Sequence, residues 1–306
     1  MNIREWTLPV YTILTQLSTG ALLFIMLIRW FQRRVFSQED LEYSTKIPIF
    51  IILITVIVAI GFAHLHLSRP LLSFTALRNL ATSWLSRELF FNLVLICILA
   101  AFSYLLWFKK GIYPIKNILG WLAILAGLAT EFCMARIYMI PSQPAWNTFL
   151  TPLSFFLTTM LLGVMTVPVL LMMDLIFKKS LSQEKSSIHI QLVSFSLNWL
   201  SVLAIIFSIC MSILIFYQTV ILIGGSPAAQ TSLELITDIY RPLFIIRLIF
   251  MFTGAGWLGF TSVQYYRGKI LVEHLLTHVF TACLLVMVAE ILGRFLFYAI
   301  HVKIGI

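Results

Sequence analysis

Long stretches of apolar residues dominate this chain of 306 residues. A helix of about 20 apolar residues is long enough to cross the hydrocarbon core of a bilayer. Eight stretches of about that length lie near residues 8–30, 47–67, 88–108, 115–138, 152–177, 192–217, 242–266 and 272–300. The sequence therefore predicts an all-α integral membrane protein with eight transmembrane helices, in which residues 1–306 form a single polytopic domain.

The composition excludes a water-soluble domain. Hydrophobic residues make up 60% of the chain and charged residues only 11%, whereas soluble domains carry about 25% charged residues. The net charge of +9 would suggest a nucleic-acid partner in a soluble protein. In a membrane protein it is explained by the excess of basic residues in cytoplasmic loops, so we expect no nucleic-acid partner.

The basic residues also predict an orientation. The loops that follow odd-numbered stretches carry eleven lysines and arginines, and the opposite side carries six. Because the side richer in basic residues faces the cytoplasm, we expect both termini on the periplasmic side of the membrane.

The four cysteines give no sign of a metal or cluster site. Cys97, Cys133, Cys210 and Cys283 lie in separate apolar stretches, and the sequence has no CxxC motif. They are typical of small buried hydrophobic residues. We therefore expect no metal site and no iron–sulfur cluster in this protein.

Ionisable residues gather at the predicted outer ends of several helices. His64 and His66 end the second stretch, Arg69 follows in the loop, and Glu88 opens the third stretch. The other polar residues at this level are Glu131, Arg136, Tyr138, Arg247, Glu290, Arg294, Tyr298 and His301. The inner half of the bundle shows no comparable collection. A charged side chain deep in a bilayer costs about 3 kcal/mol, so this convergence indicates a ligand site or a set of ion pairs.

The last stretch carries three of these residues on one face. Glu290, Arg294 and Tyr298 follow each other at intervals of four residues, which places them in one stripe along a helix. Glu290 and Arg294 could instead form an ion pair within that helix. Arg136 and Arg247 could extend their charged ends to the interface. Whether Glu131, Arg136, Arg247 and Glu290 belong to a site or only pair structurally is left open by the sequence.

Two other classes of membrane protein fit the pattern less well. A haem held by His66 and His301 would lie shallow, because both residues are at the apolar boundary, and His274 and His278 lie at the opposite end of the last stretch. A transporter would carry its polar residues near the midplane between broken helices, and only Pro168 interrupts a stretch here. No HExxH, GxSxG or Walker-type motif supports hydrolase or nucleotide chemistry.

Four segments resemble the membrane anchor subunits of dimethyl sulfoxide reductases (DmsC type). They are REWTLPVYTILTQLSTG, HLHLSRPLLSFTALRNLATSWLSRE, ARIYMIPSQPAWNTFLTPLSFFLT and AEILGRFLFYAIHVKIG. The resemblance covers the whole sequence in order and spacing. Its most specific parts are the His-Leu-x-x-Pro segment that begins at His66, the Ser-Trp-Leu-Ser-Arg-Glu segment ending at Glu88 and the Glu-x-x-Gly-Arg-x-x-Phe-Tyr segment ending at Tyr298. One departure is Ser68, where the family usually has glycine.

The resemblance implies a function. Such a subunit lies in the bacterial inner membrane, has no haem, and anchors a molybdopterin catalytic subunit and an iron–sulfur subunit. It takes menaquinol from the membrane quinone pool and oxidises it near the periplasmic leaflet. We expect His66 and Glu88 to hydrogen-bond the quinol and accept its protons, and Arg69, Arg294 and Tyr298 to tune or orient them. The sequence leaves the terminal electron acceptor and the quinone type open.

Overall fold

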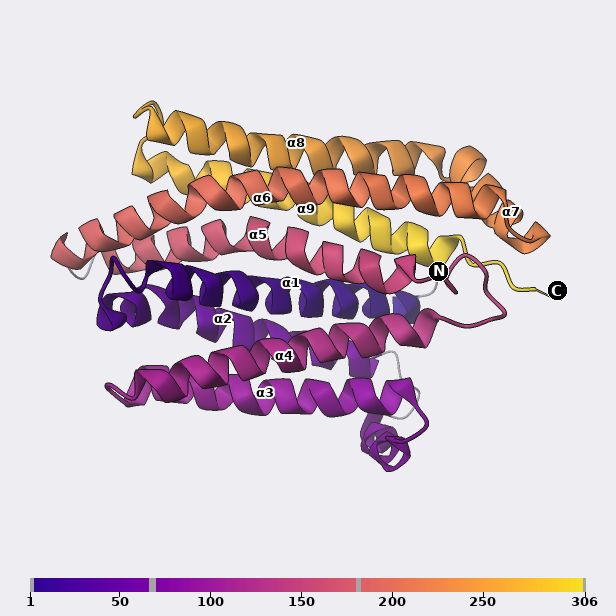
Figure 1. Cartoon of the computed structure of the whole chain (residues 1–306), viewed down its shortest axis with the longest axis horizontal. Helices are drawn as coiled ribbons and strands as arrows, with labels where there is room; N and C mark the ends of the chain where they lie inside the picture. Colours follow the sequence, from indigo (N-terminus) through magenta and orange to yellow (C-terminus); the bar gives the residue numbers. More distant parts are fainter. Residues whose placement is uncertain (1–2, 66–69, 180–182, 305–306) are drawn as a thin grey trace.

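A computed structural model describes residues 3–65, 70–179 and 183–304, and in these ranges every regular element is a helix (Figure 1). The elements are α1 (Ile3–Gln32), α2 (Gln38–Leu65), η1 (Pro70–Asn79), α3 (Trp84–Phe108), α4 (Tyr113–Tyr138), α5 (Leu150–Lys179), α6 (Gln183–Ile223), α7 (Pro227–Glu234), η2 (Leu235–Ile239), α8 (Arg241–Tyr266) and α9 (Val272–Ala299). The prediction of an all-α protein is confirmed.

Eight of these helices are long and apolar enough to cross a membrane, namely α1 to α6, α8 and α9. This confirms the predicted number of spans, although α2 begins at Gln38 and α6 at Gln183, each nine residues before the predicted stretch. Hydropathy marks only the apolar part of a helix, whereas backbone hydrogen bonding continues into polar residues such as Glu39 and Asp40. Both ends of the polypeptide reach the same end of the bundle, which we call the termini end (Figure 1).

The helices run roughly along one axis, with α1 and α5 in the middle of the bundle (Figure 1). Helices α3 and α4 pack together on one side, and α6, α8 and α9 lie on the other. The apolar windows of α1 and α5 are 83% and 78% buried, more than those of the other spans. These two central helices can therefore contribute side chains to sites on both sides of the bundle.

Two glycines allow the central helices to approach closely. A Cβ atom on Gly20 of α1 would lie 2.0 Å from the carbonyl oxygen of Thr159 and 3.0 Å from the Cα atom of Gly163 on α5. Small residues at such crossings let helix backbones meet inside a membrane. The contact lets Gln16, one turn before Gly20, donate from Nε2 to the carbonyl oxygen of Phe155 at 2.9 Å.

The connection between α4 and α5 covers the end of α9. Trp146 donates from its indole nitrogen to the carbonyl oxygen of Phe297 at 2.8 Å, and the backbone nitrogen of Ile304 donates to the carbonyl oxygen of Ser142 at 3.0 Å. Trp146 also stacks on Phe297, with ring centroids 5.0 Å apart. This connection holds the last turns of α9 in place, and those turns carry Arg294 and Tyr298.

Candidate functional site

A buried carboxylate lies near the start of α3. Ser83 caps this helix by accepting a hydrogen bond from the backbone nitrogen of Ser86, which places Glu88 in the second turn and facing inward. Glu88 is 6% exposed, and its Oε1 accepts a hydrogen bond of 2.5 Å from the hydroxyl of Tyr11 on α1. The same hydroxyl accepts a hydrogen bond from Asn92 Nδ2 at 2.7 Å. The predicted site residue Glu88 is thus bound by Tyr11 of α1, whose hydroxyl is held in turn by Asn92 of α3.

A second carboxylate lies beside the first. Glu131 of α4 is 0% exposed, and among the described residues neither of its oxygens has a hydrogen-bond partner. It interacts electrostatically with Arg294 and Glu88. We call Tyr11, Glu88, Asn92 and Glu131 the carboxylate cluster.

Arg136, on the same helix as Glu131, has other neighbours. Its guanidinium lies 5.2 Å from the ring of Trp84, and Nη1 lies 3.3 Å from the sulfur of Met139. Arg136 thus packs at the end of α4, in agreement with the interpretation that it extends towards the interface.

The stripe on α9 faces the interior of the bundle. Arg294 donates from Nη2 to Oε1 of Gln16 at 2.7 Å, and its guanidinium lies 3.9 Å from the ring centroid of Phe155. The hydroxyl of Tyr298 lies 2.6 Å from the hydroxyl of Tyr138 on α4. Two residues predicted for the site, Arg294 and Tyr298, therefore bind α1 and α4, the helices that carry Tyr11 and Glu131.

Glu290 has partners on two other helices. Its Oε2 accepts a hydrogen bond of 2.7 Å from the hydroxyl of Thr158 on α5. Its Oε1 lies 4.0 Å from Nη2 of Arg247 on α8. Among the side chains that the structure describes, the ion pair of Glu290 is thus with α8 and not with Arg294 on its own helix. The alternative of an ion pair within α9, which the sequence left open, is not formed, because the two side chains reach different helices.

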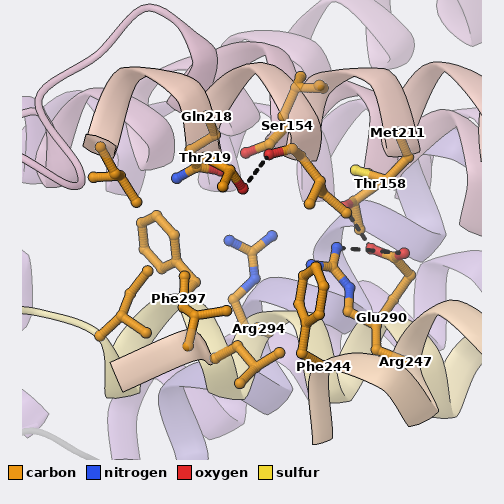
Figure 2. A pocket seen from close by; sticks show the side chains of 17 residues that line it. Ser154, Thr158, Met211, Gln218, Thr219, Phe244, Arg247, Glu290, Arg294 and Phe297 are labelled. Atoms are coloured by element: carbon orange, nitrogen blue, oxygen red, sulfur yellow. Dashed lines mark hydrogen bonds and ion pairs between the residues drawn. The ribbon is translucent and has the colours of Figure 1, made fainter. Parts of the chain in front are cut away.

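A cavity of about 70 Å³ lies next to this stripe, between α5, α6, α8 and α9. Figure 2 shows the guanidinium groups of Arg247 and Arg294 near the middle of the cavity, with Glu290 and Thr158 at one side. Phe244 and other apolar side chains form much of the remaining wall. We call this cavity the arginine chamber.

The structure describes some of the histidines at the termini end and not others. His66 and Arg69, two predicted site residues, lie outside the described residues together with Ser68. His64 contacts the carbonyl oxygen of Ile60 on its own helix through Nδ1 at 2.8 Å. His301 contacts the carbonyl oxygen of Tyr298 at 2.6 Å and is exposed. The predicted roles of His66 and Arg69 in quinol binding stay predictions.

The end of the bundle opposite the termini also holds buried ionisable residues, so the expectation of no comparable collection there is wrong. Lys178 Nζ lies 2.6 Å from Oδ1 of Asp174 one turn earlier, and it also donates to the carbonyl oxygen of Tyr43. Lys116 Nζ lies 2.8 Å from Oε1 of Glu42. The sequence reading counted Lys116 and Lys178 as loop charges, but α4 and α5 extend far enough to bury both.

Two more buried ionisable residues, His189 and Arg29, lie at this opposite end. His189 Nδ1 lies 3.3 Å from Oδ2 of Asp174. Arg29 donates to the hydroxyl of Thr45 at 2.8 Å. We call Arg29, Glu42, Lys116, Asp174, Lys178 and His189 the opposite-end cluster.

Several residues of the candidate site were not predicted from the sequence. Asn92 follows Glu88 by one helical turn, and this spacing could have revealed it. Tyr11, Gln16 and Thr158 carry no such signal, because an isolated polar residue in an apolar stretch does not show which helix it will face. The residues that the structure describes include no group of three or more His, Cys, Asp or Glu residues that could hold a metal ion.

Comparisons with known proteins point to one family. A family profile described as "DMSO reductase anchor subunit (DmsC)" matches residues 1–300. "Anaerobic dimethyl sulfoxide reductase chain YnfH" of Escherichia coli K12 is 26% identical over 309 residues, which cover 99% of this protein and 96% of that relative. An anaerobic dimethyl sulfoxide reductase subunit of Haemophilus influenzae is 25% identical over 319 residues, which cover 100% of this protein and 98% of that relative. A second anaerobic dimethyl sulfoxide reductase subunit of Escherichia coli K12 is 24% identical over 310 residues, with 99% and 96% covered.

Proposed function

The protein belongs to the family of DMSO reductase anchor subunits (DmsC) and is a multi-pass protein of the bacterial inner membrane, and on that premise we propose that it oxidises menaquinol at the termini end of the bundle. The electrons pass to an iron–sulfur partner subunit and from there to a molybdopterin catalytic subunit. The anchor holds both partners at the membrane.

One observation above all supports a proton-accepting site. Glu88 is buried in a membrane-spanning helix, yet its partner at 2.5 Å is the neutral hydroxyl of Tyr11 and not a cation. Burying a carboxylate is costly unless it is paired or neutralised by a proton. A carboxylate with a hydroxyl partner can gain or lose a proton without breaking an ion pair. Glu88 therefore suits a reaction that releases protons.

Quinol oxidation is such a reaction, because each quinol gives up two electrons and two protons as it becomes quinone. In the proposed site, Glu88 and His66 accept hydrogen bonds from the quinol hydroxyls and take up their protons. Arg69, Arg294 and Tyr298 orient these groups and set the local charge. Arg294 can do so from its position beside Gln16 and Glu131.

The proposed topology places the termini end on the periplasmic side, as the distribution of basic residues predicts. Protons from the quinol would then leave towards the periplasm. We also propose that this subunit binds neither haem nor an iron–sulfur cluster, so that the quinol passes its electrons directly to the partner subunit. A reduced-minus-oxidised absorption spectrum of the separated anchor subunit checks this point, because a haem band would contradict it.

Glu88→Gln in the assembled complex tests the proposal. The amide keeps the size of the side chain and can accept from Tyr11, but it cannot take up a proton. We expect menaquinol oxidation to fall by a factor of about 10² to 10⁴, the range for loss of a general base. Retention of both partner subunits on the membrane confirms assembly.

The matched control is Glu39→Gln, which makes the same change at an exposed carboxylate at the start of α2. We expect this variant to oxidise menaquinol at the wild-type rate. His66→Ala extends the test to the loop after α2, where we expect a loss similar to that of Glu88→Gln. If Glu88→Gln assembles and oxidises menaquinol at the wild-type rate, Glu88 is structural and the proposed site is wrong.

A further inference from the structure

The size of the arginine chamber decides what it can hold. A quinone ring system is larger than benzene, and a cavity that takes up benzene measures about 150 Å³. The chamber measures about 70 Å³. A water molecule needs about 10–15 Å³ of a cavity measured in this way, so the chamber has room for several water molecules. It is too small for a quinol ring and large enough for water.

The polar atoms of the chamber also favour water. Arg247 Nε, Glu290 Oε1 and Arg294 Nε are buried, and within the described residues none of them has a hydrogen-bond partner. The contact of 4.0 Å between Glu290 and Arg247 is too long for a hydrogen bond. A buried water molecule needs two to four polar partners, and empty cavities in proteins are apolar. These three atoms provide the partners that water requires.

The chamber lies beside the carboxylate cluster. Arg294 lines the chamber and also interacts electrostatically with Glu131. The polar wall continues through Gln218 and Thr219 towards the end of α6 at the termini end. Glu131 is 0% exposed, so a proton that reaches the cluster needs a hydrated route to leave it. The chamber is a cavity with polar walls in the position that such a route requires.

We propose that the arginine chamber is a hydrated outlet for protons, and that Glu290 is the carboxylate through which they enter its water. The inference rests on the proposed function. Each quinol gives its two electrons to the iron–sulfur partner and its two protons to Glu88 and His66. Each proton then passes to the carboxylate of Glu290 and on to chamber water, while no other bond is made or broken. Arg247 and Arg294 keep Glu290 close to positive charge after each proton has left.

Glu290→Gln tests the proposal in the assembled complex with menaquinol as substrate. Glutamine can still accept from Thr158 but cannot carry a proton. We expect kcat for quinol oxidation to fall about tenfold or more, because proton release becomes limiting. The KM for quinol should stay within about twofold, since the chamber does not bind the ring. The solvent deuterium isotope effect on kcat should rise, which a merely structural defect would not cause.

The outcomes separate this inference from the proposed function. If Glu290→Gln has the wild-type kcat and isotope effect while Glu88→Gln is inactive, the quinol site stands and the outlet is wrong. If Glu88→Gln also oxidises menaquinol at the wild-type rate, the proposed proton-accepting site itself is wrong. Glu39→Gln serves again as the control for the substitution.

A structure of the wild-type complex at a resolution that shows ordered water tests the chamber without any variant. We expect water bound between Arg247, Glu290 and Arg294. A chamber that is dry, or filled by a side chain or a lipid, would overturn the proposal even if Glu290→Gln failed to assemble.

Discussion

The two ends of the bundle both bury carboxylates, but they hold them in different ways. In the opposite-end cluster, Glu42 and Asp174 lie 2.8 Å and 2.6 Å from lysine nitrogens. At the termini end, Glu88 is bound by a phenol, Glu290 is bound by a threonine hydroxyl, and the cation paired with Glu290 is 4.0 Å away. Glu131 has no hydrogen-bond partner among the described side chains. The opposite end is ion-paired, and the termini end is held mainly by neutral groups.

This difference separates carboxylates that stabilise the fold through ion pairs from carboxylates that can gain or lose a proton. When the carboxylate of a buried ion pair takes up a proton, it loses its charge and the pair is broken. Breaking such a pair costs about 3–5 kcal/mol. A carboxylate bound by a hydroxyl keeps its partner in either protonation state, because a hydroxyl can both donate and accept. The opposite-end cluster is therefore suited to joining helices, whereas the termini end is suited to moving protons.

The largest effect that we expect is on stability at the opposite end. Lys178→Met leaves Asp174 buried without its cation, so the variant should be destabilised by about 3–5 kcal/mol. The midpoint of thermal unfolding of the purified complex measures this loss. Menaquinol oxidation per assembled complex should stay within about twofold of wild type, because distant sites are usually independent.

The double variant Lys178→Met with Asp174→Asn provides the control. Asp174→Asn removes the buried charge that Lys178→Met leaves unpaired, so part of the lost stability should return. A single variant as stable as the wild type, or a double variant no better than the single, would show that this ion pair within α5 does not stabilise the protein.

At the termini end we expect Tyr11→Phe to affect activity more than stability. The change removes the donor to Glu88 Oε1 and the acceptor of Asn92. Menaquinol oxidation should fall by a factor of about 10 to 100, because Glu88 loses the contact that positions it. In a Glu88→Gln background the same change should add little further loss, since the two residues act as one unit. Additive losses would mean that Tyr11 acts elsewhere.

A smaller effect is expected between α4 and α9. Tyr138→Phe removes one hydroxyl of the pair with Tyr298 but leaves the packing of the ring on Trp146 and Phe297. A single neutral hydrogen bond contributes about 1 kcal/mol, so thermal stability should fall slightly and quinol oxidation should change by less than about threefold. A loss as large as that of Tyr11→Phe would place Tyr138 in the proton-accepting site.

The sequence predicted the fold better than it predicted the site. Eight spans follow directly from hydropathy, because a helix in lipid must be long and apolar. The placement of Glu88, Arg294 and Tyr298 at one end of the bundle was also predicted, because ionisable and phenolic residues are rare in such helices and their depth can be counted from the ends; their roles stay predictions. Each of them lies at the termini end in the structure.

Contacts between helices were the part that the sequence could not supply. Tyr11 and Thr158 lie 77 and 132 residues from the carboxylates that they bind, and nothing in a local pattern encodes such pairs. The opposite-end cluster was missed for a related reason. A lysine at the end of an apolar stretch is equally compatible with a loop and with a buried ion pair, and only the position of its partners on other helices, such as Glu42 and Tyr43 of α2, decides between them.

The final prediction is an expected absence of charge movement. If quinol protons leave at the termini end and the acceptor is reduced on that same side, turnover carries no net charge across the membrane. The paired carboxylates of the opposite-end cluster cannot relay protons to the other face without breaking their ion pairs, which is costly. In proteoliposomes that contain the oriented complex, menaquinol-driven turnover should therefore leave a potential-sensitive dye unchanged, whereas a proton-pumping quinol oxidase in the same vesicles gives a signal. A potential that builds up during turnover and collapses with an uncoupler would mean that protons cross the bundle, and the contrast between its two ends would then be wrong.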